Sequence, residues 1–391
     1  MLRLLVVAVL LFAALASGSA QAQDQKSDAV ACSDPDSLGR LGWCWSVKGS
    51  VEAGVALDIA DGELFATLIS APGTVLVNHG IDKNVSAVVT RLASEAHIVM
   101  STEAMTEWGL ASSVIDIALS RDTTQSGAIE QAYVRFGAIT VGLAPSIFNF
   151  ATGYTHTDGI GSDQRVTQFA AEWGIGPASL AVALEDAETR SAVSDTWGKR
   201  GDTTWPDIVV RARVFSDYGL FQAMAAVREL SPAEPDVAPR TGYALGGGVE
   251  LRVDNLVPGA KILASGVISK GALTYSGASD FVTDFFVDDG ALHSTEASSY
   301  LLSALVPVGT KSSVAASFSR QSTKTEGPDL TWWTETLIAS ATANTVLVPG
   351  LLSGLDVSYI RDETRDRTLG LDGARYAGER IVVTGFLTRR F

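Results

Sequence analysis

A two-residue period is clearest in the stretch Trp45-Ser46-Val47-Lys48-Gly49-Ser50-Val51-Glu52-Ala53-Gly54-Val55-Ala56-Leu57-Asp58-Ile59. Its odd-numbered positions are apolar or glycine, and its even-numbered positions are mostly polar or small. Because successive side chains of a strand point to opposite faces, the stretch predicts a β-strand with two different sides. A run of about fifteen residues is longer than the usual strand of a soluble protein. The pattern is typical of a membrane strand that turns one side to lipid and the other to a polar interior.

The same alternation recurs later in the chain. It is present at 207–214, 243–253, 262–268, 300–306 and 314–318. Short turns are expected at 254–259 and 308–310, and near Trp108-Gly109, Gly137, 174–177, Tyr218-Gly219 and Pro349-Gly350. Short turns between long alternating runs are typical of antiparallel hairpins.

Longer polar segments separate these hairpins, at 144–164, 188–204, 231–240, 280–297, 323–329 and 362–378. Short turns that alternate with long loops are the asymmetry of an outer-membrane barrel. A soluble β-sandwich is the alternative, but its strands do not often reach about 12 residues. The strand count between residues 60 and 95 stays open, because 64–69 and 85–92 alternate poorly.

The composition agrees with such a barrel. Apolar residues make up 46% of the chain, charged residues make up 19%, and the mean hydropathy is +0.20. Beyond Ala22 no window holds about 18 consecutive apolar residues, so no membrane-spanning helix is expected. Residues 23–391 number 369 (391 minus 22). That length suits a single all-β domain, a transmembrane antiparallel β-barrel of about sixteen strands.

Both ends of the chain carry signals of export. Met1-Leu2-Arg3, the apolar run 4–16 and Ala20-Gln21-Ala22 predict that residues 1–22 are a cleaved signal peptide. A membrane anchor is the alternative, but the apolar run is shorter than the roughly 20 residues that a spanning helix needs. At the other end, 381–391 reads as an amphipathic strand that closes on Phe391. A terminal aromatic residue is the assembly signal of bacterial outer-membrane barrels, so Phe391 is expected to address the barrel assembly machinery.

The chain has two cysteines, Cys32 and Cys44, with eleven residues between them. In an exported chain the pair predicts a disulfide that closes a small loop, worth about 2 to 3 kcal/mol. Two free thiols are the alternative. A zinc site is not expected, because no ligand spacing joins the scattered histidines His79, His97, His156 and His293 to the cysteines.

The formal charge of −15 and the pI of about 4.7 exclude a basic nucleic-acid surface. Acids gather in the expected loops, as in 284–289 and Asp362-Glu363. They are interpreted as soluble, repulsive loops. The alternatives are that they attract cations to the mouth or bind divalent ions that bridge lipopolysaccharide phosphates. No Gly-x-Ser-x-Gly, His-Glu-x-x-His or phosphate-binding glycine loop occurs in the sequence. Neither an enzyme nor a cofactor is therefore expected.

Two stretches resemble the alphaproteobacterial general porins. Cys32 to Asp58 is similar to the first disulfide loop and strand of that family. Ala132-Tyr133-Val134-Arg135-Phe136-Gly137, with Thr140-Val141-Gly142 and Ser146-Ile147-Phe148-Asn149-Phe150, is similar to its fifth and sixth strands and the entry to its third loop. The resemblance implies a sixteen-stranded barrel, usually a trimer, whose long third loop folds into the lumen and narrows it to an eyelet.

This resemblance implies an eyelet between the loop 145–164, with the acids Asp158 and Asp163, and bases on the barrel wall. The candidates of inward parity are Lys48, Arg135, Arg211, Arg213 and Arg252, with Glu52, Tyr133 and Glu250 as further pore-lining candidates. Opposed charges in a low-dielectric wall create a transverse field that filters solutes by size and polarity. Each arginine has the alternative of being a solvated residue far from the narrowing. Phe148 and Phe150 are expected to pack the loop root, and Asn149 stands where related sequences often carry an acid.

The sequence thus predicts a porin of the bacterial outer membrane, a water-filled passive channel for small hydrophilic solutes and ions. A substrate-specific channel with a saturable binding site is the main alternative, and an enzyme or a closed adhesin on the same scaffold is a further one. The expected partners are outer-membrane lipids and lipopolysaccharide, the assembly machinery, solutes in transit and further copies in a homotrimer. Candidates for the trimer interface are Trp45, Val47, Val51, Ile381 and Leu387.

Overall fold

The structure is a computed structural model. It describes residues 43–391 apart from 63, 71–73, 83–86, 107–108, 122–124, 193–200, 279–282, 327–330 and 367–373. The expected signal peptide and Cys32 of the expected disulfide lie outside the described residues. Among the described residues, no helix is long and apolar enough to cross a membrane.

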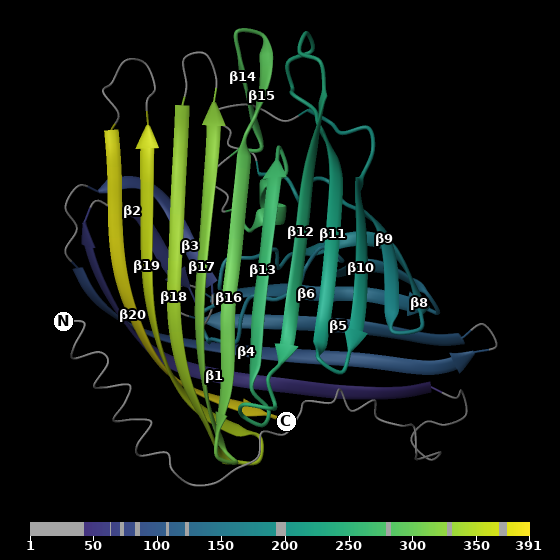
Figure 1. The fold of residues 1–391 in the computed structure, drawn as a ribbon, viewed down its shortest axis with the longest axis vertical. Helices are drawn as coiled ribbons and strands as arrows, with labels where there is room; N and C mark the ends of the chain where they lie inside the picture. The colour runs from purple at the N-terminus through teal and green to yellow at the C-terminus, as the bar shows by residue number, and fades with distance from the viewer. Residues whose placement is uncertain are drawn as a thin grey trace.

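Sixteen strands form one closed antiparallel barrel, which confirms the predicted fold (Figure 1). β1 closes the ring, because it pairs with β4 on one side and with β20 on the other. The barrel strands are β1 (Trp43–Gly62), β4 (Ala87–Thr106), β5 (Gly109–Arg121), β6 (Gln125–Phe136), β7 (Ile139–Pro145), β8 (Arg165–Ile175), β9 (Ala178–Glu185), β10 (Asp207–Ser216), β11 (Gly219–Leu230), β12 (Arg240–Arg252), β13 (Lys261–Lys270), β16 (Glu296–Val308), β17 (Ser312–Glu326), β18 (Thr331–Val348), β19 (Leu351–Asp366) and β20 (Ala374–Arg390).

Two hairpins form separate sheets outside the barrel wall. One consists of β2 (Leu64–Ser70) and β3 (Thr74–Asp82), and the other of β14 (Phe285–Asp288) and β15 (Ala291–Ser294). The second hairpin stands beyond the ends of the barrel strands (Figure 1). The first lies in the region where the strand count was open, in the connection between β1 and β4. Because β2 and β3 pair with each other and not with the barrel strands, the alternation that lipid imposes on a wall strand is not required at 64–69.

The two faces of the wall differ as the alternation predicted. On β16, Tyr300 and Leu302 are exposed on the outer side, whereas Ser299 and Ser303 are buried on the inner side. Residues that are paired across neighbouring strands lie on the same face of a sheet. The outer face therefore carries an apolar surface, to which Trp45, Val47, Val55, Phe169, Ile208 and Leu245 belong.

Short turns lie at one end of the barrel, as predicted. Gly137, Gly176, Gly309 and Gly350 form four of them, with φ values of 56°, 60°, 70° and 76°. Glycine adopts these left-handed values without the strain that a Cβ atom causes. The C-terminus lies at the same end (Figure 1), where Phe391 and Gly49 exchange two backbone hydrogen bonds of 3.0 Å. The long loops consequently lie at the other end.

Candidate functional site in the barrel interior

We call the connection between β7 and β8, residues 146–164, the inner loop. Its two ends are fastened together at Asn149, whose Nδ2 donates to Asp163 Oδ1 (3.3 Å) and to Gln164 O (3.0 Å). Asn149 Oδ1 accepts from Ser162 Oγ (3.2 Å) and from Gln164 N (3.3 Å). An amide both donates and accepts, whereas an ionised carboxylate only accepts. Asn149 therefore makes both donated and accepted hydrogen bonds at the loop ends, which an aspartate at this position could not do.

The tip of the inner loop bonds to the opposite wall. β16 to β19 stand across the ring from β7 and β8, and their inward side chains bond the loop. The bonds join Tyr154 N to Ser303 Oγ (3.0 Å), Thr155 Oγ1 to Ser317 Oγ (2.9 Å), His156 N to Thr342 Oγ1 (2.7 Å), Thr157 Oγ1 to Asp356 Oδ2 (2.7 Å) and Ile160 N to Ser319 Oγ (3.0 Å). The ring of His156 also stacks on Phe386 of β20, with centroids 3.9 Å apart. The loop is thus held along the inner surface from β16 to β20.

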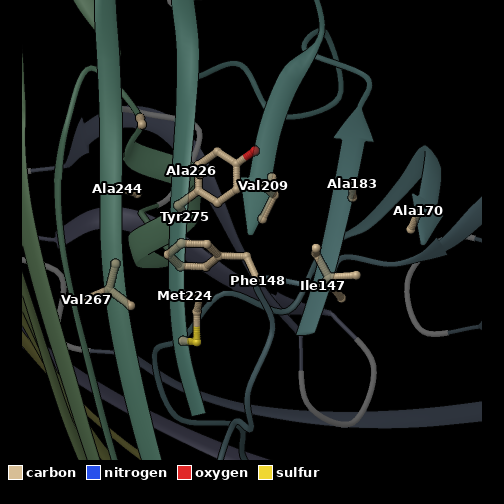
Figure 2. Close-up of a cluster of buried hydrophobic side chains, with 12 residues drawn as sticks. Ile147, Phe148, Ala170, Ala183, Val209, Met224, Ala226, Ala244, Val267 and Tyr275 are labelled. Atoms are coloured by element: carbon tan, nitrogen blue, oxygen red, sulfur yellow. The ribbon is translucent and has the colours of Figure 1, made fainter. Parts of the chain in front are cut away.

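A cluster of apolar side chains lies in the interior beside β8 to β13. Figure 2 shows Phe148 of the inner loop between Tyr275 and Met224. Phe148 is fully buried and meets Tyr275 edge to face at 4.8 Å, and Phe150 packs against the same cluster. The expected packing of both phenylalanines at the loop root is confirmed. The expectation of a polar interior holds only in part on this side. The apolar cluster occupies some inward positions of these strands, whereas Arg211, Gln222 and Glu250 occupy others.

A second inward segment packs on the inner loop. It contains the short helix η1 (Leu273–Ser276), whose four residues are all buried. Gln321 Nε2 on β17 donates to Ser276 O (3.2 Å). A Cβ atom at Gly277 would lie 2.6 Å from the carbonyl oxygen of Gly161, so only glycine permits this approach.

A network of buried charges joins η1 to the outer ends of β9, β10 and β11. Its members, each at most 1% exposed, are Glu185, Arg190, Asp207, Arg228 and Asp284. Arg190 Nε lies 3.3 Å from Glu185 Oε2, and Arg228 Nη1 lies 2.9 Å from Asp284 Oδ2. Tyr275 OH donates to Asp207 Oδ2 (2.9 Å). Burial, with the neighbouring Glu185 and Asp207 carboxylates, raises the pKa of the Tyr275 hydroxyl well above its ordinary value, so the hydroxyl remains a donor.

Three of the predicted pore-lining residues have partners at the inner loop or beside it. Arg211 Nη2 lies 2.7 Å from Glu172 Oε1, and Arg211 is only 7% exposed. Arg213 donates to Gln222, whose Nε2 donates to Asn149 O of the inner loop (2.9 Å). Tyr154 OH donates to Glu250 Oε2 (2.7 Å). These charges hold the loop and its surroundings, and the partners Glu172 and Gln222 were not singled out from the sequence.

The remaining predicted residues lie apart from that group. Lys48, Arg135 and Arg252 are exposed, and each lies near the short-turn end of its strand. Glu52 and Tyr133 are half-buried on inward positions of β1 and β6. On the inner loop, Asp158 accepts from Thr152 Oγ1 (2.8 Å), and Asp163 Oδ2 lies 3.3 Å from Arg165 Nη1. The structure does not gather the five predicted bases opposite the two loop acids.

A row of carboxylates and imidazoles crosses β1, β4 and β5, and of its members only Glu52 was predicted from the sequence to line the pore. His97 Nε2 lies 2.8 Å from Glu95 Oε1, and His97 Nδ1 lies 3.6 Å from Asp116 Oδ1. Glu95 is paired with Glu52 across the β1–β4 ladder, and Glu52 Oε1 lies 3.6 Å from His156 Nε2 of the inner loop. The available signal was the two-residue spacing of Glu95 and His97, which places both on the inner face of β4.

Comparison with known proteins agrees with this architecture. The sequence family described as the porin subfamily matches residues 75–377. The outer membrane channel DcaP of Acinetobacter baumannii is similar in structure, with a TM-score of 0.68 at 15% identity over 90% of this chain and 98% of that chain. The anion-selective porin from Comamonas acidovorans has a TM-score of 0.53 at 12% identity, over 89% of this chain and 100% of that chain.

The trimer form of OmpT from Vibrio cholerae has a TM-score of 0.50 at 7% identity, over 88% of this chain and 99% of that chain. At such identities the structural likeness shows the fold alone. The chain has no match among curated protein sequences.

Proposed function

The chain belongs to the porin subfamily, and from this premise we propose that it is a general diffusion porin whose aperture is set by the inner loop. As a porin, it is a channel of the bacterial outer membrane. The finer proposal is that small hydrophilic solutes and ions pass without a saturable binding site. The observation that carries it is the row of hydrogen bonds from the loop tip to β16–β19, because a loop fixed across the interior narrows the passage without closing a pocket around one ligand.

A substrate-specific channel is the second candidate. The specific observation in its favour is the apolar packing beside β8 to β13, which leaves less open interior than a uniformly hydrated barrel would have. Solute competition separates the two candidates, because only a binding site saturates.

The test is planar-bilayer recording of the refolded, processed chain, with candidate sugars and amino acids added in turn. A general porin gives large ohmic steps that no solute changes. Steps that one solute blocks in a saturable manner would establish the specific channel instead. A correctly folded barrel without any conductance would contradict both candidates and favour a closed adhesin.

The proposal includes a homotrimer. The Vibrio cholerae neighbour occurs in a trimer form, and the outer face of β19, β20, β1 and β4 here carries a groove of about 790 Å³. Small residues such as Ala53, Ser94, Ser353 and Gly385 line it, beside the predicted interface residue Leu387. A second barrel wall can approach closely over small side chains. Migration of an unboiled sample as a monomer in mild detergent would contradict the trimer.

Three further expectations stand as part of the proposal. The alphaproteobacterial subgroup rests on the resemblance of 32–58 and 132–150. Export through cleavage after residue 22 rests on the N-terminal sequence, and mass spectrometry of the mature chain tests both the cleavage and the Cys32–Cys44 disulfide. Lipopolysaccharide and the assembly machinery are the proposed partners at the outer surface and at Phe391.

A further inference from the structure

We infer that the row of Glu52, Glu95, His97, Asp116 and His156, here called the acid–imidazole row, makes the channel select for cations. This inference rests on the proposed function and extends it, because a general porin can prefer either sign of ion. It also replaces the expected arrangement, in which acids on the loop faced bases on the wall.

The row lies where the interior is left uncovered. The inner loop follows the wall from β16 to β20, and the root of the loop with its apolar cluster packs on β8 to β13. Within the described part of the chain, the inward faces that remain are those of β1, β4, β5, β6 and β7. A path through the barrel therefore passes between these strands and the inner loop, and the row lies beside it, from Asp116 on the wall to His156 on the loop.

The row is continuous from the wall to the loop tip. Asp116 on β5 faces His97, His97 bonds Glu95, Glu95 is opposite Glu52, and Glu52 faces His156. The side chains of His97 and Glu95 are 36% and 21% exposed. Three carboxylates thus stand within reach of a passing ion at the level where the loop tip meets the wall.

Three buried polar atoms of the row have no hydrogen bond within the described residues: Glu52 Oε1, Asp116 Oδ1 and His156 Nε2. Their charge partners are other members of the row, at 3.6 Å: Asp116 Oδ1 faces His97 Nδ1, and Glu52 Oε1 faces His156 Nε2. A buried acceptor without a donor is unfavourable, and a cation with its water supplies what is missing. No three His, Cys, Asp or Glu side chains of the described ranges converge on one metal position. The row is therefore a string of separate charges that an ion can pass, rather than a metal site.

The bases on the same strands lie toward the strand ends rather than within the row. Arg91 lies near the outer end of β4, and Arg135 lies near the short-turn end of β6. On β6, Gln131 Nε2 donates to Asp116 Oδ2 (3.4 Å) and carries no charge. Toward the outer end, Arg380 is engaged electrostatically with Asp362 and Asp58. Lys48 lies on β1 near the short-turn end, and the inner loop adds the exposed acids Asp158 and Asp163. In a low-dielectric wall, such a row of acids attracts cations and repels anions.

The test is the reversal potential of the refolded channel across a potassium chloride gradient. The wild-type channel is expected to prefer potassium, and Glu95→Gln with Asp116→Asn is expected to lower the potassium-to-chloride permeability ratio by roughly two- to fivefold for each charge removed. Glu234→Gln removes one acid from an exposed outer loop and serves as the matched control, with an unchanged ratio expected.

Each outcome has one meaning. A conducting channel that is unselective, or that keeps its ratio in the double variant, would overturn the inference and leave the porin function intact. A folded barrel without conductance would overturn the proposed function itself. If the double variant fails to fold, Glu95→Gln alone is the deciding variant, because it preserves shape and hydrogen bonding to His97.

Discussion

Phe150 lies in the space that Gly248 leaves open on the inner face of β12, where a Cβ atom would stand 2.4 Å from the phenyl ring. The root of the inner loop can therefore pack against β12 because Gly248 has no side chain there. The missing side chain at Gly248 makes room for the Phe150 ring at the loop root. Gly248 is the last residue of the run Gly246-Gly247-Gly248.

Gly248→Val is expected to displace the loop root, because the added atoms cannot share space with the ring. Overpacking of this kind costs about 1 to 3 kcal/mol. Gly247→Val is the matched control: it is the next residue, faces the other side, and its Cβ atom would meet no atom closer than 3.5 Å. Unfolding midpoints in urea should fall for the first variant alone. Equal midpoints would show that the loop root is not seated there.

Asn149→Asp is expected to loosen the root of the inner loop. The change removes the amide that donates to Asp163. It also brings the new carboxylate close to the Asp163 carboxylate, because the Asn149–Asp163 hydrogen bond is 3.3 Å long. Leaving such a site unsatisfied costs roughly 1 to 3 kcal/mol. Adding Asp163→Asn should restore stability and the wild-type conductance. A single variant as stable as the wild type would mean that the bonds at Asn149 do not fasten the loop.

Arg228→Met is expected to destabilise the outer ends of β10 and β11. It leaves the buried carboxylates of Asp284 and Asp207 without their cation, and breaking one side of a buried ion pair costs about 3 to 5 kcal/mol. Lys270→Met removes the exposed pair with Glu296, which is expected to cost about 1 kcal/mol or less. Thermal unfolding compares the two. Equal losses would contradict the structural role of the buried network.

Phe391→Ala is expected to lower the amount of barrel that reaches the outer membrane. The Phe391 ring packs over Gly49, where a Cβ atom would lie 2.5 Å from it, so the residue also helps to close the β1–β20 seam. Refolding into detergent separates the two roles. If the variant refolds normally in vitro but assembles poorly in cells, Phe391 acts as the assembly signal. If it fails in both, Phe391 is needed to close the β1–β20 pair.

The sequence predicted the wall far better than the interior. The alternation at Trp45–Ile59 and 300–306 arises because every second side chain faces lipid and must be apolar. This pattern is local, so it can be read without knowing the fold. It failed at 64–69 because β2 and β3 lie outside the wall. The pattern also could not show that Val209 and Met224, which face inward, meet Phe148 rather than water, since that contact depends on where a distant loop lies.

The same limit applied to the candidate site. Parity placed Arg211 and Arg213 on the inner face correctly, but it could not reveal that Glu172 and Gln222 engage them. His97 was considered only as a zinc ligand and set aside, because no ligand spacing joins it to the cysteines. Its contact with Asp116 on the next strand could not be seen from spacing along the chain. Long-range register, which brings these residues together, is set by the closed ring and not by spacing along the chain.

The most direct test of a channel whose aperture is set by the inner loop is to shorten that loop and record single-channel conductance. Gly159 N donates to Thr152 O at 2.7 Å, so residues 153–158 can be replaced by a Gly-Gly link without stretching the chain. The account predicts larger conductance steps from a barrel that still folds. Steps of unchanged size from the folded, shortened barrel would contradict it.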